Sequence, residues 1–486
     1  YPRMGAPERI DADVAVIGAG VAGLYAALTA AEAGARVAVI SATPLAQTAS
    51  YWAQGGLAAA LAMDDSPQLH LEDTERAGRG LVRRSAAEVL TNEAPEMILA
   101  LQREGVAFDA DRYGNLSLGL EGGHSRRRIV HAGGSATGRR VARELSAALV
   151  AQPGVRVLET TRAADLWLED GRVTGVLCED GPAVRARGTI IAAGGAAALW
   201  RRTTNPPGSL GIGLLLAQRA GAAIADLEFV QFHPTAVTGV AGREGFLVTE
   251  AIRGEGATLL DPDGERFVEE LAPRDEVSRR IWEIMDRTGA PSVRLDMRHV
   301  DMARFPNVVE ALRQSGLDPA TELVPVAPAA HYVMGGIVTD LHGSAGVPGL
   351  YAIGESACTG LHGANRLASN SLSECAVFGA RAARAALDEP VPVPAGAPPA
   401  PEPIVLPARA TQEAMWRDAG LVRDREGLER LLTDPHPLAR LVARCALLRE
   451  ETRGSHIRRD FPETNPELDL HHAVVQNDEP QFELWR

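Results

Sequence analysis

Short apolar runs alternate with longer mixed segments along the first 200 residues, as in proteins whose strands are buried between helices. Residues 13–17, 36–40 and 189–193 are mostly apolar, which is typical of parallel strands covered on both faces. Residues 24–33 lie between the first two runs and predict a helix that ends at Gly34. This order of elements predicts a β-α-β unit at the start of an α/β domain.

A glycine-rich turn joins the first predicted strand to the helix. Residues 18–23 read GAGVAG, a GxGxxG in the strand-turn-helix context that a dinucleotide-binding site requires. Glycines in such a turn let the backbone approach a pyrophosphate at the helix N-terminus. The second strand ends at Ser41 rather than at the usual acidic residue, so we expect this serine to contact the ribose.

The stretch from 354 to 372 is the one around which we expect the chain to be organised. It reads GESACTGLHGANRLASNSL and links a buried strand at 349–353 to an apolar-periodic helix at 372–387. Glu355 is suited to accept from sugar hydroxyls, and the helix start near Ser371 is suited to an anion. Arg366 can grip a carboxylate with two donors. The alternative is an ordinary connection with a surface arginine.

Two further loops carry candidate chemistry. Residues 48–56, TASYWAQGG, form an uncharged loop with two aromatics, which suits either packing on a flat ring or a buried turn. Residues 121–128, EGGHSRRR, with His131 nearby, suit either an anion site with one acceptor or a solvated run of charge. Residues 156–179 alternate like a small β-meander.

Composition narrows the class of protein. The 486 residues predict two or three domains. The 49 Lys and Arg against 63 Asp and Glu give a net charge of -14, which argues against a nucleic-acid or anionic-membrane partner. The four cysteines are far apart in the sequence, so we expect no metal site and a reducing, cytoplasmic location. Residues 14–31 are uncharged, but glycines interrupt them, so neither a signal peptide nor a membrane span is expected.

Changes in composition predict a discontinuous domain organisation. We assign residues 1–226 and 331–388 to the nucleotide-binding domain, whose sheet we expect to resume at 337–339 and 350–353. Residues 227–330 are predicted to be an inserted α+β domain. Residues 389–408 contain eight prolines and are predicted to be an extended linker. Residues 409–486 are predicted to be a helical domain, with a polar and irregular tail after residue 461.

Seven motifs in order carry a resemblance to a known family. They are AQGG at 53–56, EGGHSRRR at 121–128, QFHPT at 231–235, TEAIRGEGA at 249–257, PRD at 273–275, AAHY at 329–332 and LHGANRLASNSL at 361–372. The chain resembles the flavoprotein group of L-aspartate oxidases, succinate dehydrogenases and fumarate reductases, and within it the L-aspartate oxidases. The resemblance covers residues 13 to about 463.

The resemblance implies an α/β fold: a Rossmann-type FAD-binding domain, an inserted α+β capping domain and a C-terminal helical bundle. It implies catalytic residues Arg274, Glu121, His233, His331 and Arg366. Substrate contacts are implied for Gln231, Thr249, Glu250, Arg274, His331 and Arg366. Non-covalent FAD is implied, because Ala49 stands where some relatives carry a flavin-linking histidine. We expect FAD to contact Gly18, Gly20, Val21, Ala22, Gly23, Ser41, Ser50, Ala53, Gln54, Gly55, Gly56, Ala193, Gly194, Gly195, Glu355, Asn370, Ser371 and Leu372.

The activity implied by the resemblance is oxidation of L-aspartate to iminoaspartate, which starts de novo NAD biosynthesis. Oxygen or fumarate is the implied electron acceptor, succinate is a product of the second route, and quinolinate synthase is the implied recipient of the product. Two alternatives remain at this point: a flavoprotein subunit of a succinate dehydrogenase or fumarate reductase, and a flavin-binding RNA-modification or interaction protein.

Overall fold

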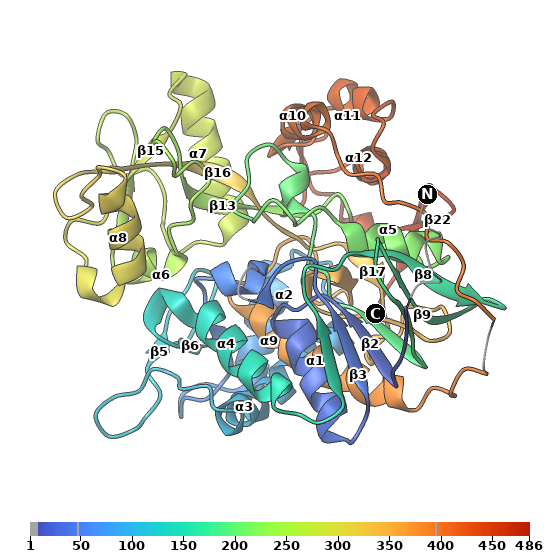
Figure 1. Cartoon of the computed structure of the whole chain (residues 1–486). Helices are drawn as coiled ribbons and strands as arrows, with labels where there is room; N and C mark the ends of the chain where they lie inside the picture. The colour runs from blue at the N-terminus through green and yellow to red at the C-terminus, as the bar shows by residue number, and fades with distance from the viewer. Residues whose placement is uncertain (1–7, 46–47, 394–395) are drawn as a thin grey trace.

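A parallel sheet of five strands forms the centre of the first domain (Figure 1). The computed structural model describes residues 8–45, 48–393 and 396–486. The sheet has the order β18-β11-β2-β3-β7. Its strands are β2 (Val14–Ile17), β3 (Val37–Ile40), β7 (Val155–Leu158), β11 (Gly188–Ile191) and β18 (Leu350–Ala352). With α1 (Val21–Glu32) between β2 and β3, the predicted β-α-β unit is confirmed.

Helices cover this sheet because their apolar faces have no other surface to bury. Helix α1 and helix α9 (Asn370–Leu387) pack into one large apolar core, which also takes residues from α3 (Arg84–Arg103) and α4 (Thr137–Val150). Helices α2 (Pro67–Ala77) and α5 (Ile212–Arg219) complete the domain. A second sheet, order β1-β10-β9-β8, consists of Arg9–Asp11, Ala183–Arg185, Arg172–Cys178 and Ala163–Glu169. The predicted meander is thus right for β8 and β9, whereas β7 belongs to the parallel sheet.

The inserted segment has its own sheet and its own core (Figure 1, yellow-green and yellow). The strand order is β13-β16-β15-β14, formed by Val230–Val237, Val324–Val333, Val293–Asp296 and Thr258–Leu260. Helices α6 (Glu250–Gly254), α7 (Arg274–Thr288) and α8 (Pro306–Gln314) accompany it. β13 and β16 are also the two strands that enter and leave the segment, so they join it to the first domain.

The C-terminal part differs from its prediction in the tail. Helices α10 (Arg409–Asp418), α11 (Arg425–Leu431) and α12 (Pro437–Leu448) are present, with the short pair β20 (Val422–Arg423) and β21 (Ile457–Arg458). The tail is not irregular: β22 (His471–Gln476) and β23 (Glu479–Leu484) form a hairpin. It completes a five-stranded sheet with β12 (Ile224–Ala225), β17 (Gly336–Val338) and β19 (Ala357–Cys358).

Two predictions fail in this sheet for one reason. Residues 337–339 were expected in the parallel sheet, but β17 pairs antiparallel with β12. β22 pairs with the other side of β12. A strand as short as β12 shows no periodicity of its own, so neither partner could be identified from pattern. The remaining strands, β4 (Leu57–Ala58), β5 (Leu118–Gly119) and β6 (Ile129–Val130), form a small sheet. No helix in the described ranges is long and apolar enough to cross a membrane.

Buried ion pairs fasten the C-terminal part to the rest. Arg449 is fully buried, and its guanidinium donates to Glu228 at 2.7 Å, to Glu451 at 2.9 Å and to the His471 carbonyl at 2.7 Å. Burial raises the pKa of Glu228 to about 7 in spite of this contact with Arg449. Such a network stabilises the fold only while every charge keeps its partner.

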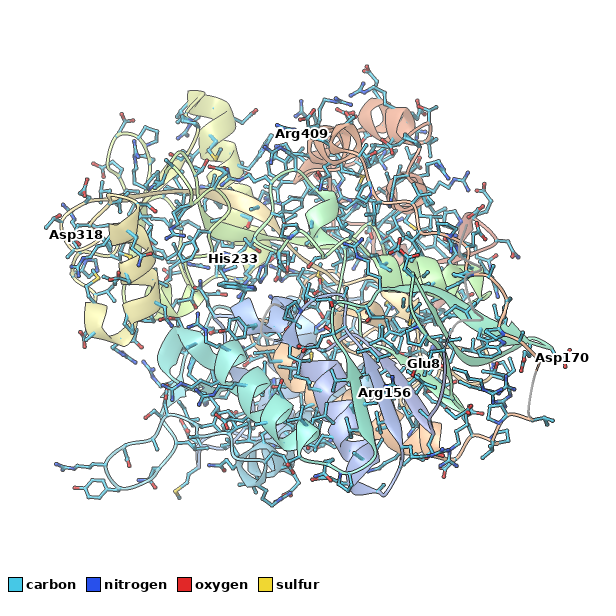
Figure 2. The ribbon with its side chains drawn as sticks, in the orientation of Figure 1. Glu8, Arg156, Asp170, His233, Asp318 and Arg409 are labelled. Atoms are coloured by element: carbon cyan, nitrogen blue, oxygen red, sulfur yellow. The ribbon has the colours of Figure 1, made fainter. Side chains whose placement is uncertain are left out.

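We therefore expect Arg449→Met to destabilise the protein by ~3–5 kcal/mol, because Glu228 and Glu451 lose a buried partner. The measurement is the urea midpoint followed by circular dichroism. The matched control is Arg409→Met on α10 (Figure 2). The Arg409 side chain is 75% exposed and pairs with Glu413. The control should stay close to the parent, since exposed pairs contribute little. Equal midpoints for the two variants would contradict this account.

Candidate functional site

The predicted substrate residues converge where the inserted segment meets the first domain. Gln231 and His233 lie on β13, Arg274 is the first residue of α7, and Arg366 lies in the loop before α9. All four are buried. Figure 2 shows His233 near the centre of the molecule, between the two parts of the chain. Residues more than 130 positions apart are therefore brought to one place.

Gln231 is the centre of this cluster. Its Oε1 accepts from Arg274 Nη1 at 3.1 Å and from Arg366 Nη2 and Nε at 3.0 and 3.2 Å. Its Nε2 donates to the Arg366 carbonyl at 2.8 Å and to Asn365 Oδ1 at 3.0 Å. The amide is therefore fully used, and it fixes both guanidinium groups from one side. Gln231 holds the two arginines rather than projecting alone toward a ligand.

The two arginines are not balanced equally by acidic groups. Arg274 Nε donates to Glu250 Oε2 at 2.6 Å, and Arg253 lies 3.5 Å from the other oxygen of Glu250. Within the described ranges, Arg366 makes no ion pair; it donates to Gln231 and to Ser371 Oγ and lies over the Tyr332 ring. Burial, with the charge of Arg274, lowers the pKa of Arg366 to about 10, so it stays charged at neutral pH. The site therefore favours an anion.

His233 and His331 form an edge-to-face pair with ring centroids 5.0 Å apart. Burial, followed by the charge of Arg274, lowers the pKa of both well below the ordinary histidine value. The Thr235 amide donates to His233 Nδ1 at 3.2 Å, which leaves the proton on Nε2. That Nε2 has no hydrogen-bond partner in the described structure. His233 is thus a neutral imidazole whose buried Nε2–H is available to donate to a ligand.

Glu121 lies beside this cluster, but its partners are not those expected. The Ser369 hydroxyl donates to its Oε2 at 2.6 Å, and His131 Nε2 lies 3.6 Å from Oε1. Arg128, at the other end of the same motif, pairs with Asp65 and Asp73 at 2.8 and 2.6 Å. Within the loop at 121–128, residues 125–127 are exposed, as a solvated charge run would be, whereas Arg128 is fully buried.

Two predicted substrate residues have structural partners. The Thr249 hydroxyl accepts from the Ala251 amide and caps α6. Glu250 is held by Arg274 and by the Gly122 amide, which donates to Oε1 at 3.1 Å. Both lie behind Arg274. Two further residues near the site were not predicted from the sequence. Arg253 lies one helical turn after Glu250 in the same motif, and Thr204 contacts His331 Nδ1 at 2.7 Å.

The predicted dinucleotide residues line a partly open strip at the carboxyl ends of the parallel strands. Helix α1 follows Gly20 and has no acid in its first turn. The Val21 amide donates to Ser50 Oγ at 3.1 Å, and the start of the helix suits an anion. A Cβ added at Gly18 would lie 2.1 Å from the Ala192 carbonyl oxygen, and one at Gly23 would lie 2.0 Å from Gly18 O. Ten of the predicted contacts are partly exposed: Gly18, Gly20, Ser50, Ala53, Gln54, Gly55, Ala193, Gly194, Glu355 and Ser371. The residues present fit a dinucleotide.

Details of this strip differ from expectation. Ser369, not Ser371, precedes α9; its φ is +62° and its hydroxyl goes to Glu121 rather than capping the helix. Ser41 is buried at the end of β3 and donates to the Thr43 carbonyl at 2.6 Å. Glu355 accepts from the Val333 amide at 3.0 Å, and burial raises its pKa to about 7. The remaining predicted contacts, Val21, Ala22, Gly56, Gly195, Asn370 and Leu372, are buried around the strip.

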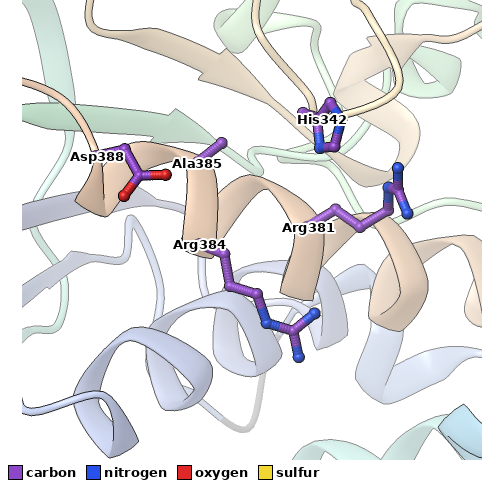
Figure 3. A pocket seen from close by; sticks show the side chains of 5 residues that line it. All are labelled: His342, Arg381, Arg384, Ala385 and Asp388. Carbon is purple, nitrogen blue, oxygen red and sulfur yellow. The ribbon is translucent and has the colours of Figure 1, made fainter.

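A surface cavity of about 460 Å³ lies elsewhere, at the C-terminal end of α9 (Figure 3). It is lined by His342, Arg381, Arg384, Ala385 and Asp388. Because α9 starts at Asn370, the lining residues 381–388 lie roughly 17–27 Å from the helix start at 1.5 Å per residue. It is not part of the cluster around Gln231. In the described ranges, no group of three or more His, Cys, Asp or Glu could hold a metal ion.

Comparisons with known proteins agree with this geometry. Residues 13–372 match the family described as FAD binding domain, and residues 432–485 match the fumarate reductase flavoprotein C-terminal family. An L-aspartate oxidase from Caulobacter vibrioides is 47% identical, over 93% of this chain and 94% of the relative. One from Streptomyces coelicolor is 42% identical, over 96% and 92%. Among solved structures, a quinol fumarate reductase from E. coli has a TM-score of 0.87 at 28% identity, covering 98% of this chain and 96% of that chain.

One contact between the two domains involves a residue with no predicted role. Arg79, in the turn after α2, donates to both oxygens of Asp275 at 2.9 and 3.1 Å and to Glu276 at 2.6 Å. These acids directly follow Arg274 at the start of α7. Arg453 from the C-terminal part donates to the Arg79 carbonyl at 2.6 Å. Arg79 therefore connects three parts of the chain at the helix that carries Arg274.

We expect Arg79→Ala to loosen the start of α7. Loss of this pair should speed amide hydrogen exchange in residues 274–288 about tenfold, the equivalent of ~1.4 kcal/mol. Exchange followed by mass spectrometry is the measurement. Arg84→Ala is the control, because Arg84 pairs with Glu75 and Glu88 on the surface and not with α7. Unchanged exchange in α7 would contradict the role of Arg79.

Proposed function

We infer the function from the family to which the chain belongs, the L-aspartate oxidases within the succinate dehydrogenase and fumarate reductase flavoproteins. The chain is an FAD-dependent enzyme that oxidises L-aspartate to iminoaspartate, the first step of de novo NAD biosynthesis. The observation in the site that carries this function is the meeting of Arg274 and Arg366 at Gln231 Oε1. Two buried guanidinium groups suit a substrate with a carboxylate at each end.

Bound FAD supplies the two-electron acceptor for the hydride that leaves Cα. The start of α1 suits its pyrophosphate, and the start of α9 suits negative charge at the flavin edge. The FAD is held non-covalently, since Ala49 offers no nucleophile. Acid precipitation should therefore leave the yellow colour in the supernatant.

The substrate's two carboxylates are divided between the two sides of the site. Arg366 belongs to the FAD-binding domain, residues 1–226 and 331–388, whereas Arg274 and His233 belong to the capping domain, residues 227–330. His233 and His331 donate as neutral imidazoles. A dicarboxylate that bridges these groups draws the capping domain closed, and closure removes water and strengthens each charged contact. The remaining parts of the proposed domain organisation are the linker, residues 389–408, and the C-terminal domain, residues 409–486.

In the opposite direction, fumarate is reduced to succinate and a carbon atom must gain a proton. Arg274 is suited to deliver it, because it comes from the capping side of the site. Glu250 contacts Arg274 at 2.6 Å and Arg253 lies 3.5 Å beyond, so these two residues can return the proton to Arg274 from the interior of the capping domain.

The electron acceptor and the fate of the product follow from the same family. Oxygen serves as an acceptor besides fumarate, and the product passes to quinolinate synthase. The enzyme acts in the cytoplasm, which agrees with four free cysteines. The second candidate function is that of a succinate dehydrogenase or fumarate reductase subunit. It is favoured by the solved quinol fumarate reductases, of which one has a TM-score of 0.88 at 28% identity.

The test of the proposed function is aspartate-dependent peroxide formation in air by the FAD-loaded protein. Arg366→Leu should lose most of this activity and weaken succinate binding by roughly 2–5 kcal/mol, because a carboxylate then faces an apolar wall. Arg381→Leu, far along α9, is the control. Succinate oxidation without aspartate oxidation would identify a succinate dehydrogenase or fumarate reductase subunit. Full activity of Arg366→Leu would contradict the binding of a substrate carboxylate by Arg366.

Glu121 is the acceptor for the α-ammonium group, the one feature that distinguishes aspartate from succinate. Glu121→Gln keeps the shape and removes the charge. Aspartate oxidation should fall by about tenfold or more, since 1.4 kcal/mol is tenfold. Fumarate reduction, which involves no ammonium, should stay near that of the parent. If both activities fall equally, Glu121 only supports the loop through Ser369.

A further inference from the structure

Two polar atoms beside the substrate cluster have no hydrogen-bond partner in the described structure: Glu121 Oε1 and His131 Nε2. Both are buried, and they lie 3.6 Å apart, too far for a hydrogen bond to each other. Buried polar atoms in folded proteins are almost always paired. The pair therefore marks a position for a donor with more than one N–H group.

The ring of His131 lies next to two glycines, Gly56 and Gly119. A Cβ added at Gly56 would lie 3.2 Å from its Cδ2, and one added at Gly119 would lie 3.0 Å from its Cε1. The Gly56 amide donates to Ser369 Oγ at 3.2 Å, and Ser369 in turn donates to Glu121. These two hydrogen bonds fix the carboxylate relative to the start of α9, and the imidazole lies 3.6 Å from that carboxylate.

The reaction needs a proton acceptor at this point. The substrate nitrogen is bound as –NH₃⁺ and has no free lone pair. One N–H bond must break before that lone pair can form the C=N bond as the Cα–H pair leaves as hydride. The products are the iminium, C=NH₂⁺, one proton on a base and two electrons with one hydrogen on FAD, the oxidant of the established reaction.

The other ionisable groups nearby are poor candidates. Glu121 Oε2 already accepts from the Ser369 hydroxyl at 2.6 Å, so Glu121 serves as the ionised partner of the ammonium group rather than as its base. His233 belongs to the carboxylate cluster. Both ring nitrogens of His124 are used, by the Ala368 carbonyl at 2.8 Å and by Arg128 at 3.1 Å.

We propose that His131 is the catalytic base of aspartate oxidation: its Nε2 accepts one proton from the substrate ammonium while Glu121 Oε1 holds the charge that remains. This assignment rests on the proposed function. It gives the two unpaired atoms separate roles, since the carboxylate binds the nitrogen and the imidazole takes its proton. A substrate without an amine releases no proton from nitrogen, so its reaction does not require His131.

The experiment compares His131→Ala with His342→Ala, an exposed histidine at the far end of α9, in FAD-loaded protein. His131→Ala should lower kcat for aspartate by about 10²-fold or more, the usual contribution of a general base. Its fumarate reduction and succinate dissociation constant should stay within about threefold, equivalent to ~0.7 kcal/mol. Added imidazole should restore part of the aspartate activity only. His342→Ala should behave as the parent.

A second variant separates catalysis from binding. His131→Gln keeps an acceptor near the position of Nε2, so it should bind aspartate and turn it over slowly. Equal losses of aspartate oxidation and fumarate reduction in His131→Ala, or undiminished aspartate turnover, would overturn the role of His131. A parent enzyme without aspartate oxidation would instead overturn the proposed function.

Discussion

The meeting of two buried arginines at one glutamine oxygen is the constraint on which the site depends. Arg274 comes from the capping domain and Arg366 from the FAD-binding domain, and both donate to Gln231 Oε1. Two guanidinium groups that share one hydrogen-bond acceptor repel each other, and burial removes the water that would screen their charges. One amide oxygen and one carboxylate, that of Glu250, do not offset this cost. The site is therefore most stable with an anionic substrate between its two sides.

The rest of the fold keeps these groups in place. α7 starts at Arg274 and is tied to the first domain through Arg79, which the C-terminal part contacts through Arg453. β13 and β16 carry the histidines and are also the strands that join the capping domain to the rest of the chain. The same strands therefore form the connection between the domains and one wall of the site.

Much of the site was readable from sequence because its motifs are local. GAGVAG lies between a strand and a helix. The loop at 354–372 also joins a strand to a helix, and such a connection does not by itself require an arginine like Arg366. What the motifs could not give was the partner of each residue. Gln231 accepts from two arginines, and Glu121 contacts Ser369, which is 248 positions away. A sequence motif specifies a residue type, whereas a contact depends on how distant segments pack.

The sequence by itself determined the α/β class, the nucleotide-binding turn, the inserted α+β segment and the helices after the linker, because each follows from local periodicity, glycine placement and composition. Only the tertiary structure decided that the tail is a hairpin paired to β12, that β17 lies outside the parallel sheet, and that Arg128 is structural rather than ligand-binding. These outcomes depend on long-range pairing and on burial. Strands of two or three residues and single buried charges have no periodicity, so their places are fixed only by the segments that surround them.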